Sequence, residues 1–161
     1  MINRRMNALR DSLYTLLLAT MLLFSRPLLA SDLLMVRTTQ GFPEAMLALQ
    51  NSIREHGYNI TRVQRIDVGL TGMGYKTDKY RVVFVGKPKE IQYLVNKYPV
   101  LAAYMPPKIS IFAENGETVL VTANPLVYAE MIDDDKDKIL FRRWESDVYS
   151  VFDDIREAED K

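Results

Sequence analysis

The spacing of apolar and polar residues predicts a strand followed by a helix just after residue 31. The segment "DLLMVRTT" (32–39) is a short run rich in aliphatic residues, which favours a strand. In "GFPEAMLALQNSIREHG" (41–57) apolar residues recur at steps of three and four, which is typical of an amphipathic helix. Pro43 suits the first turn of this helix, and Gly57 suits its end.

Two further strands are expected on either side of a glycine-rich loop. The segment "YNITRVQRIDV" (58–68) permits a strand, although neither of its faces is consistently apolar. "YRVVFVG" (80–86) is dense in β-branched residues, as is typical of a buried strand. Between them, "GLTGMGYKTDK" (69–79) contains three glycines within six positions, and we expect it to be a flexible loop.

A short helix and a β-hairpin are predicted next. The segment "KPKEIQYLVNKYP" (87–99) favours a helix that ends before its last proline. From 108 to 122, "KISIF" and "TVLVT" each alternate apolar and polar residues around the pair Asn115-Gly116. This pair supplies the positive φ angles of a tight hairpin turn, so the segment is predicted to be a hairpin with a structural role.

Helices are predicted for the rest of the chain. Asn124 suits the N-cap of one helix, in which Pro125 takes the first position. From Ile139 onward the sequence "ILFRRWESDVYSVFDDIREAEDK" predicts an amphipathic helix of about twenty residues. Its apolar stripe, at steps of four and three and opposite acidic residues, consists of Leu140, Trp144, Val148, Val151 and Ile155.

Two interpretations of this apolar stripe remain open. The first is that the helix packs against the sheet of its own domain. The second is that Leu140, Trp144, Val148 and Val151 form a surface for a protein partner or for self-association. The second interpretation rests on Trp144, the sole tryptophan, because aromatic anchors concentrate in interfaces.

The order of these elements predicts an α+β fold, written β-α-β-β-α-β-β-α-α. Two strand–helix–strand units follow one another, and the helices are segregated from a mainly antiparallel sheet, which favours a two-layer sandwich with helices on one side. We expect this α+β domain to occupy residues 31–131. The acidic amphipathic helix then occupies residues 132–161.

Residues 1–30 have the features of a signal peptide. Three arginines among the first ten residues precede an uncharged apolar run, Leu13 to Phe24. This run is shorter than the roughly 20 residues that span a bilayer. Cleavage is expected after Ala30, with an uncleaved anchor as the alternative. The leader predicts transport across the inner membrane to the periplasm, with no membrane attachment after cleavage.

Composition narrows the possible chemistry. The chain has no cysteine, which excludes thiolate catalysis, disulfide exchange and cysteine-ligated metals. Residues 31–161 carry 17 basic and 20 acidic side chains, and this net charge of −3 does not indicate a nucleic-acid-binding protein. Residues 76–97 are mainly basic, whereas residues 130–161 are mainly acidic. We expect these two regions either to face each other or to remain solvated.

Several of these segments resemble the domain of unknown function 302 family. They are "REHGYNI", "IDV", "YRVVFVGKP" and "YPVLAAYMPPKISIFAENGETVLVTANP", and the resemblance covers about Leu33 to Met131. It implies a compact α+β domain of unsettled activity. This sequence has Pro107 at a corner that the family often fills with cysteine. A thiol role proposed for the family therefore does not transfer to this chain.

Asp67 is the best-placed candidate for chemistry. It is expected at the end of a strand beside the glycine-rich loop, where rigid strands commonly present functional groups. The alternative interpretation is a polar cap on the turn. Together with Gly72, Gly74, Tyr80 and Arg81, it forms a candidate binding site for a small polar ligand. The loop lacks the Gly-Lys-Ser/Thr ending of a P-loop, which argues against a phosphate cradle.

Neither the single histidine nor the acidic run indicates a catalytic or metal site. His56 lies in the last turn of a predicted helix, where an imidazole suits interaction with the helix C-terminus. The run "DDDKDK" (133–138) lacks the central glycine and closing glutamate of a calcium-binding loop. We therefore expect no metal and no cofactor.

The sequence thus favours a small exported binding or accessory protein without identifiable catalytic machinery. The alternative is a small-molecule-binding protein or enzyme that uses the polar site near Asp67 and Arg81. Nothing in the residues names a ligand or a reaction, and an enzyme is the less favoured reading.

Overall fold

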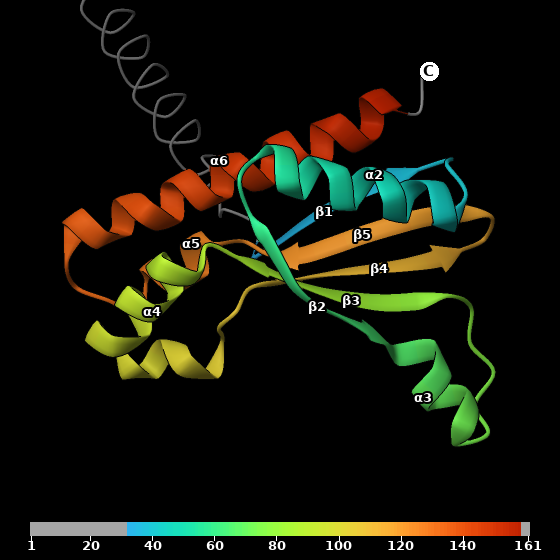
Figure 1. The fold of residues 1–161 in the computed structure, drawn as a ribbon, viewed down its shortest axis with the longest axis horizontal. Helices are drawn as coiled ribbons and strands as arrows, with labels where there is room; N and C mark the ends of the chain where they lie inside the picture. Colours follow the sequence, from blue (N-terminus) through green and yellow to red (C-terminus); the bar gives the residue numbers. More distant parts are fainter. Residues whose placement is uncertain (1–31, 159–161) are drawn as a thin grey trace, which may run out of the picture. The chain divides into compact units, whose positions relative to one another are not determined.

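A five-stranded antiparallel sheet forms the centre of the fold (Figure 1) in the computed structural model, which describes residues 32–158. The strands lie in the order β1-β5-β4-β3-β2 across the sheet. Their bounds are Leu33–Thr38 (β1), Asn59–Arg65 (β2), Tyr80–Gly86 (β3), Lys108–Glu114 (β4) and Glu117–Ala123 (β5). Every neighbouring pair is antiparallel, which confirms the predicted α+β class and its antiparallel sheet. The predicted signal peptide lies outside the described residues.

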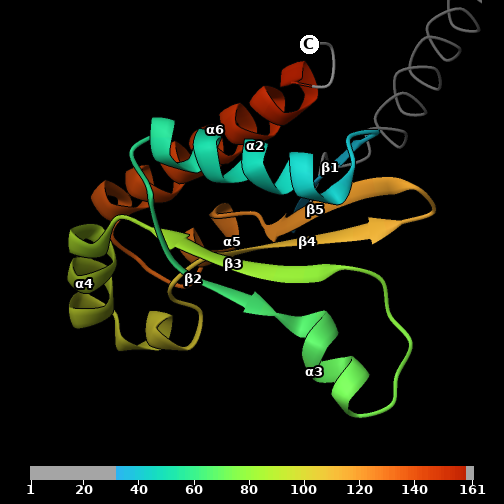
Figure 2. The ribbon, with the colours of Figure 1, turned by 45° about the vertical axis from the view of Figure 1, so that its right-hand side comes forward.

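Helices cover one face of this sheet and lie at both of its ends (Figure 1). They are α2 (Phe42–Glu55), α3 (Ile66–Gly72), α4 (Pro88–Lys97), the 3-10 helix η1 (Pro99–Ala103), α5 (Leu126–Ala129) and α6 (Asp135–Glu157). Figures 1 and 2 show α2 and α6 side by side on the same face, whereas α4 and η1 lie at one end of the sheet. Between residues 32 and 158, no helix is long and apolar enough to cross a membrane.

The predicted hairpin is confirmed in β4 and β5. Its turn consists of Asn115 and Gly116, whose φ angles are 53° and 87°. Both values lie in the left-handed region, which asparagine tolerates better than most residues and which glycine adopts freely. The strands then pair from Glu114 opposite Glu117 to Ile109 opposite Thr122.

The expected glycine-rich loop is corrected by the structure, because its first part is the short helix α3. Asp67 lies in the first turn and accepts a hydrogen bond from the backbone N–H of Val68 at 2.9 Å, which suits the positive end of a helix. Gly72 is the last helical residue, and Gly74 has a φ of 87° just beyond the end. The glycine content suggested a loop, but an acidic residue in the first turn and a glycine just beyond the end favour one or two helical turns.

The larger of two hydrophobic clusters lies between the sheet and the pair α2 and α6. From the strands it takes the residues that alternate toward this face, such as Val36, Ile111 and Leu120, none of which is more than 3% exposed. Leu49 and Ile53 of α2 and Phe152 and Ile155 of α6 meet them from the other side. This packing explains why the strands show a period of two and the two helices a period close to 3.6.

The second cluster joins α4, η1 and α5 to the first half of α6. Its buried members include Leu94, Leu101, Tyr128, Phe141 and Trp144. The rings of Phe141 and Trp144 meet edge to face with centroids 5.4 Å apart. Helix α6 therefore contributes to both clusters and ties the end of the sheet to its helical face.

The position of α6 decides between the two interpretations of its apolar stripe. Trp144 and Val151 are 2% and 4% exposed, and Leu140 and Val148 are half-buried, so these side chains pack within their own domain. A surface for a partner made of this stripe is therefore a wrong expectation. The helix also begins at Asp135 rather than Ile139, because the Asp134 carboxylate caps it by accepting the Lys136 N–H at 2.9 Å.

The basic middle and the acidic end of the chain face each other. On α4, Lys97 lies 2.8 Å from Asp137 and 2.9 Å from Asp134 at the start of α6. Nearly two turns further along α6, Arg143 lies 2.5 Å from Glu90 of α4. The contacts of Lys97 agree with the first of the two expectations, whereas the pair of Arg143 and Glu90 joins a basic residue of the acidic end to an acidic residue of the basic middle.

Candidate functional site: a pocket beside Tyr58 and Asp147

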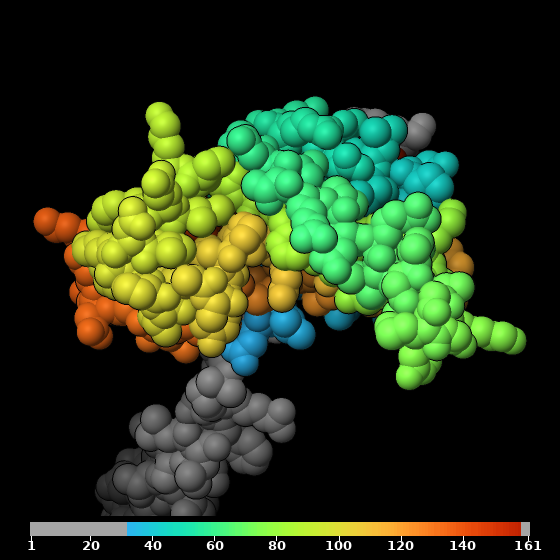
Figure 3. Space-filling view, turned by 60° about the horizontal axis from the view of Figure 1, so that its bottom comes forward, coloured from blue at the N-terminus to red at the C-terminus, as the bar shows by residue number. Residues whose placement is uncertain are grey.

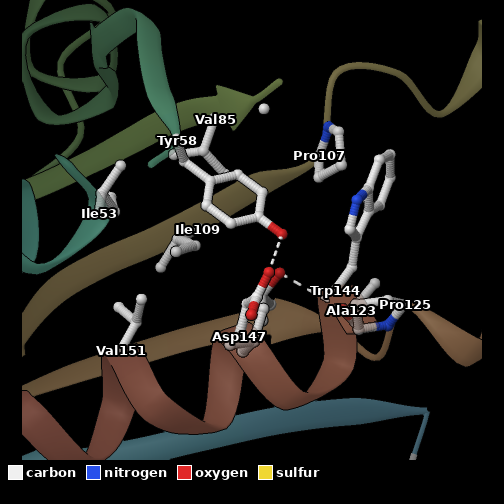
Figure 4. Close-up of a pocket in the computed structure, with 13 residues that line it drawn as sticks. Ile53, Tyr58, Val85, Pro107, Ile109, Ala123, Pro125, Trp144, Asp147 and Val151 are labelled. Carbon is white, nitrogen blue, oxygen red and sulfur yellow. Dashed lines mark hydrogen bonds between the residues drawn. The ribbon is translucent and has the colours of Figure 1, made fainter. Parts of the chain in front are cut away.

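An apolar pocket lies between α6 and the sheet, where the two hydrophobic clusters meet (Figure 4). Val85 and Ile109 of the sheet, Pro107 before β4, and Trp144 and Val148 of α6 form much of its wall. The pocket is partly open to solvent, and its cavity measures about 40 Å³. A single water needs roughly 10–15 Å³ by this measure, so the cavity accepts a few non-hydrogen atoms.

Tyr58 reaches the pocket because of the way α2 ends. Gly57 has a φ of 75°, its N–H donates to the Arg54 carbonyl at 2.9 Å, and the Tyr58 N–H donates to the Ile53 carbonyl at 3.0 Å. This is the hydrogen-bond pattern of a Schellman motif, in which a glycine ends the helix and the next residue folds back over it. Tyr58 and Ile53, brought together in this way, both line the pocket.

Asp147 is the charged residue among those that line the pocket, and it accepts a hydrogen bond from the Tyr58 hydroxyl at 2.6 Å. Figure 4 shows the tyrosine directed across the pocket at the carboxylate. Burial, followed by the hydrogen bond to Asp147, raises the pKa of Tyr58 well above its usual value. The hydroxyl therefore stays protonated at neutral pH and acts as a donor, not as a base or nucleophile.

Two cations and a second carboxylate surround this pair. The Lys87 ammonium lies 3.8 Å from the Asp147 carboxylate and 4.3 Å from the centre of the Tyr58 ring. Arg143 lies 3.9 Å from Asp147 but only 2.5 Å from Glu90. Glu90 also accepts the Trp144 indole N–H at 2.9 Å, which fixes the orientation of the ring in the pocket wall.

Asp67 and Arg81, two of the residues expected to bind a ligand, are brought together as an ion pair. Both side chains are 15% exposed, and the Arg81 guanidinium donates directly to the Asp67 carboxylate. This hydrogen bond lowers the pKa of Asp67 below its usual value. The two groups neutralise each other, so Asp67 is not poised as a general base.

Tyr80 and the glycines do not join this ion pair. Tyr80 precedes Arg81 in β3, and consecutive strand residues point to opposite faces of a sheet. Accordingly, Arg81 lies near the Phe42 ring beside α2, whereas the Tyr80 ring packs edge to face on Phe112 with centroids 5.8 Å apart. Gly72 and Gly74 lie exposed at the end of α3. The five candidates therefore do not form one site.

His56 lies at the C-terminus of α2, as its sequence position suggested. It is the C-cap residue, and its Nε2 lies 3.0 Å from a carboxylate oxygen of Asp154 on α6. The same oxygen accepts the Ser52 hydroxyl at 2.5 Å, so this contact joins α2 to α6. In residues 32–158, no three histidine, aspartate or glutamate side chains are placed to hold a metal ion together.

Sequence reasoning missed Tyr58 and Asp147 because they are 89 positions apart. One signal was available: an aromatic residue directly after a glycine helix stop is the position that folds back on the helix. Pro107 offers a second signal, since it stands where the resembling family often has cysteine and it lies in the pocket wall. Val85 donates its N–H to the Pro107 carbonyl at 2.9 Å, which holds this corner against the sheet.

Comparison with known proteins agrees with this architecture. The family model described as "Domain of unknown function DUF302" matches residues 34–155. The chain belongs to the DUF302 family. The DUF302 match ends within the last turn of α6, which extends the resemblance well past Met131 and places the C-terminal helix inside the family's domain. The expectation that residues 132–161 form a segment separate from the family's domain is therefore corrected. Helix α6 contributes buried side chains to both hydrophobic clusters of the core.

A solved DUF302 structure shows the same fold. It is the crystal structure of an uncharacterized conserved protein DUF302 from Bacillus stearothermophilus, with 20% sequence identity and a TM-score of 0.71. The similarity covers 79% of this chain and all of the other. At this identity the DUF302 neighbour establishes the fold alone. None of the curated proteins compared matches this chain.

Proposed function

We propose that this protein is a small exported binding or accessory protein that holds a small, largely apolar ligand in the pocket beside Tyr58 and Asp147. The observation that supports this most directly is the pocket's composition. Its wall is aliphatic and aromatic, and the carboxylate of Asp147 is the one charged group that lines it. Ligand sites are typically concave and apolar with a few convergent polar groups that set orientation.

The polar groups at the open side of the pocket are suited to binding a ligand. Tyr58 keeps its proton, and Asp147 is held in place by that tyrosine with Lys87 and Arg143 within 4 Å. A ligand can place its apolar end between Trp144 and the sheet. Its polar end can then reach the charged groups of Asp147, Lys87 and Arg143. Because the cavity measures about 40 Å³, the enclosed end is a short chain or a small ring edge unless side chains move.

Export and periplasmic location are part of this proposal. They rest on the basic start, the short apolar run and the small residue at position 30 in the sequence. The absence of cysteine means that stability in an oxidising compartment depends on packing and ion pairs. No reaction is assigned to the protein.

The sole tryptophan of the chain provides the test, because Trp144 lines the pocket. We would titrate the protein with three series of straight-chain compounds, namely alcohols, amines and carboxylates of increasing length. Binding is expected to change the Trp144 fluorescence in a saturable way and to raise the melting temperature. Compounds from all three series that leave both measurements unchanged would overturn the proposal.

Matched variants locate the binding. Val148→Phe fills the pocket from α6 at a half-buried position, so it should abolish the response. Asp147→Asn should leave the contribution of the apolar chain to binding unchanged. It should alter the order in which alcohols, amines and carboxylates of the same length are preferred. The double variant Asp67→Ala and Arg81→Ala tests the alternative site, since its residues do not line this pocket. Binding that disappears in this double variant but survives Val148→Phe would transfer the ligand to the Asp67 site.

A further inference from the structure

The face of the sheet opposite α2 and α6 carries no helix of the described part of the chain (Figures 1 and 3). In Figure 3, the blue and orange strands are visible between the yellow lobe of α4 and η1 and the green lobe of α3. The strand register fixes which side chains share this face. One row crosses all five strands and consists of Met35, Val121, Ser110, Val82 and Gln64. The adjacent row consists of Arg37, Val119, Phe112 and Tyr80.

The middle of this open face is apolar. Met35 is 51% exposed and Leu33, two residues earlier on the same face, is 54% exposed. Val121 and Phe112 are half-buried, and neither belongs to the two hydrophobic clusters of residues 32–158. An antiparallel sheet with one face in water usually carries polar residues there. Val82 and Val119, in the centre of the face, are 9% and 0% exposed, so the accessible apolar surface consists of Leu33 and Met35 with parts of Val121 and Phe112. An exposed apolar patch of this kind can mark an interaction site.

The two ends of the open face carry opposite charges. Lys108 and Glu114 are the first and last residues of β4, and an even spacing puts both side chains on this face. They are separated by about 20 Å, at about 3.3 Å per residue. Lys108 is exposed and makes no ion pair within residues 32–158, whereas Glu114 pairs with Arg37 at 2.6 Å and keeps 41% of its side chain exposed.

We propose that this open face binds the same face of a second copy of the chain. A two-fold axis that passes midway between the two sheets, over the middle of β4, parallel to the sheet and perpendicular to the strand, reverses the strand direction in the partner. Each Lys108 then lies opposite the partner's Glu114, Val121 lies opposite the partner's Val119, and Met35 lies opposite the partner's Arg37. Packed sheets lie roughly 10 Å apart, a distance that a lysine and a glutamate span together.

The charge pattern favours a second copy over an unrelated partner. A two-fold interface must be self-complementary, because the same patch is used by both subunits. One strand that carries a lysine at one end and a glutamate at the other meets this condition without any further residue. The C-terminal helix does not offer such a surface, because its apolar stripe is buried in the domain. This inference does not depend on the ligand pocket, which lies on the other face of the sheet.

Charge exchange at Lys108 and Glu114 tests the interface. The wild-type protein, purified in the form recovered after export, is compared with the variants Lys108→Glu and Glu114→Lys. The measurement is sedimentation over a range of protein concentrations. The wild type should be a dimer, and each variant should weaken the dimer at least about tenfold, because like charges then face each other twice. An equimolar mixture of the two variants should recover a dimer, since both contacts are again between opposite charges.

Further variants keep the test decisive. Val121→Lys, in the middle of the face, should also give monomers with an unchanged circular dichroism spectrum. Tyr149→Glu changes the exposed side of α6, where Tyr149 is 48% exposed, and should leave the dimer intact. The proposal is overturned by a wild type that stays monomeric at about 1 mM. Its dimer dissociation constant would then be above that concentration, and the association would be too weak for a specific interface. A mixture of the charge variants that fails to associate, or a dimer lost only in Tyr149→Glu, also overturns it.

Discussion

The hydroxyl of Tyr98, which follows α4, donates a hydrogen bond of 2.7 Å to the carboxylate of Asp137 in the first turn of α6. The same carboxylate accepts the Lys97 ammonium at 2.8 Å and the Tyr93 hydroxyl at 3.2 Å. Asp137 is 7% exposed, so a buried carboxylate with three donors fastens α4 to α6. This contact borders the second hydrophobic cluster and thus supports the helix that forms one wall of the pocket.

The first prediction concerns the pH dependence of stability through Asp137. The hydrogen bond from Lys97, and then those from Tyr98 and Tyr93, hold the pKa of this carboxyl below its usual value. Its contribution to the free energy of unfolding is therefore complete above the unfolded-state pKa of roughly 3.9, and is lost as the pH falls through the lower folded value. Asp137→Asn should be less stable than the wild type at pH 7, and this difference should shrink below about pH 4.

Urea unfolding at a series of pH values measures this difference. Asp135→Asn is the matched control, because Asp135 lies in the same helical turn but its side chain is 89% exposed. The control should follow the wild type closely at every pH. A difference between Asp137→Asn and the wild type that grows as the solution becomes more acidic would contradict the assignment.

The second prediction concerns the energetic role of α6. Phe152 is 1% exposed and packs in the larger cluster, so Phe152→Ala should lower the free energy of unfolding by about 3–5 kcal/mol. Tyr149, which is 48% exposed on the same helix, should cost no more than about 0.5 kcal/mol when replaced by alanine. Truncation after Met131 removes Phe152 and Ile155 together and should abolish cooperative unfolding, as measured by circular dichroism on heating.

An unchanged melting temperature after this truncation would show that α6 is dispensable for the fold. It would restore the interpretation in which the helix serves a partner. The oligomeric state of the truncated chain, measured on a sizing column, separates these outcomes from aggregation of an unfolded chain.

Elements governed by local signals could be predicted from the sequence, but α3 could not. The hairpin follows from Asn115-Gly116, and the limits of α2 follow from Pro43 and Gly57, because each signal acts on neighbouring backbone. Segment 66–72 has two glycines, which disfavour a helix by about 1 kcal/mol each. Its helix depends on Asp67, which contacts Arg81 of the next strand, and this contact is a tertiary effect.

The pocket, and the surface against which α6 packs, could not be predicted for a related reason. Periodicity shows that a helix has an apolar face, but it does not show what covers that face. Trp144 therefore fitted both a core and a partner surface until its surroundings were known. Tyr58 and Asp147 come from a helix end and a distant helix, and their hydrogen bond exists only after α6 has packed on the sheet.

The third prediction concerns export, which the leader sequence suggests. The protein recovered from the envelope of its host should begin at Ser31, because the leader has a basic start, a short apolar run and Ala30 at the expected cleavage site. Intact-mass measurement and N-terminal sequencing give the answer directly. Ala30→Leu should slow processing by removing the small residue. Recovery of the whole chain beginning at Met1 would contradict cleavage and favour the anchor.

The last prediction compares two glycines that differ in backbone conformation. An added Cβ would have no neighbour within 4 Å at either Gly116 or Gly69, so crowding is the same at both positions. Gly116 has a φ of 87° in the hairpin turn, where alanine is strained, and Gly116→Ala should destabilise the protein by about 1 kcal/mol. Gly69 lies inside α3, where alanine favours the helix, and Gly69→Ala should stabilise it by up to about 1 kcal/mol. Urea unfolding of both variants checks the opposite signs. If both substitutions shifted the unfolding midpoint in the same direction, either the turn or the helix would be assigned incorrectly, and hydrogen exchange of residues 66–72 in Gly69→Ala would show which.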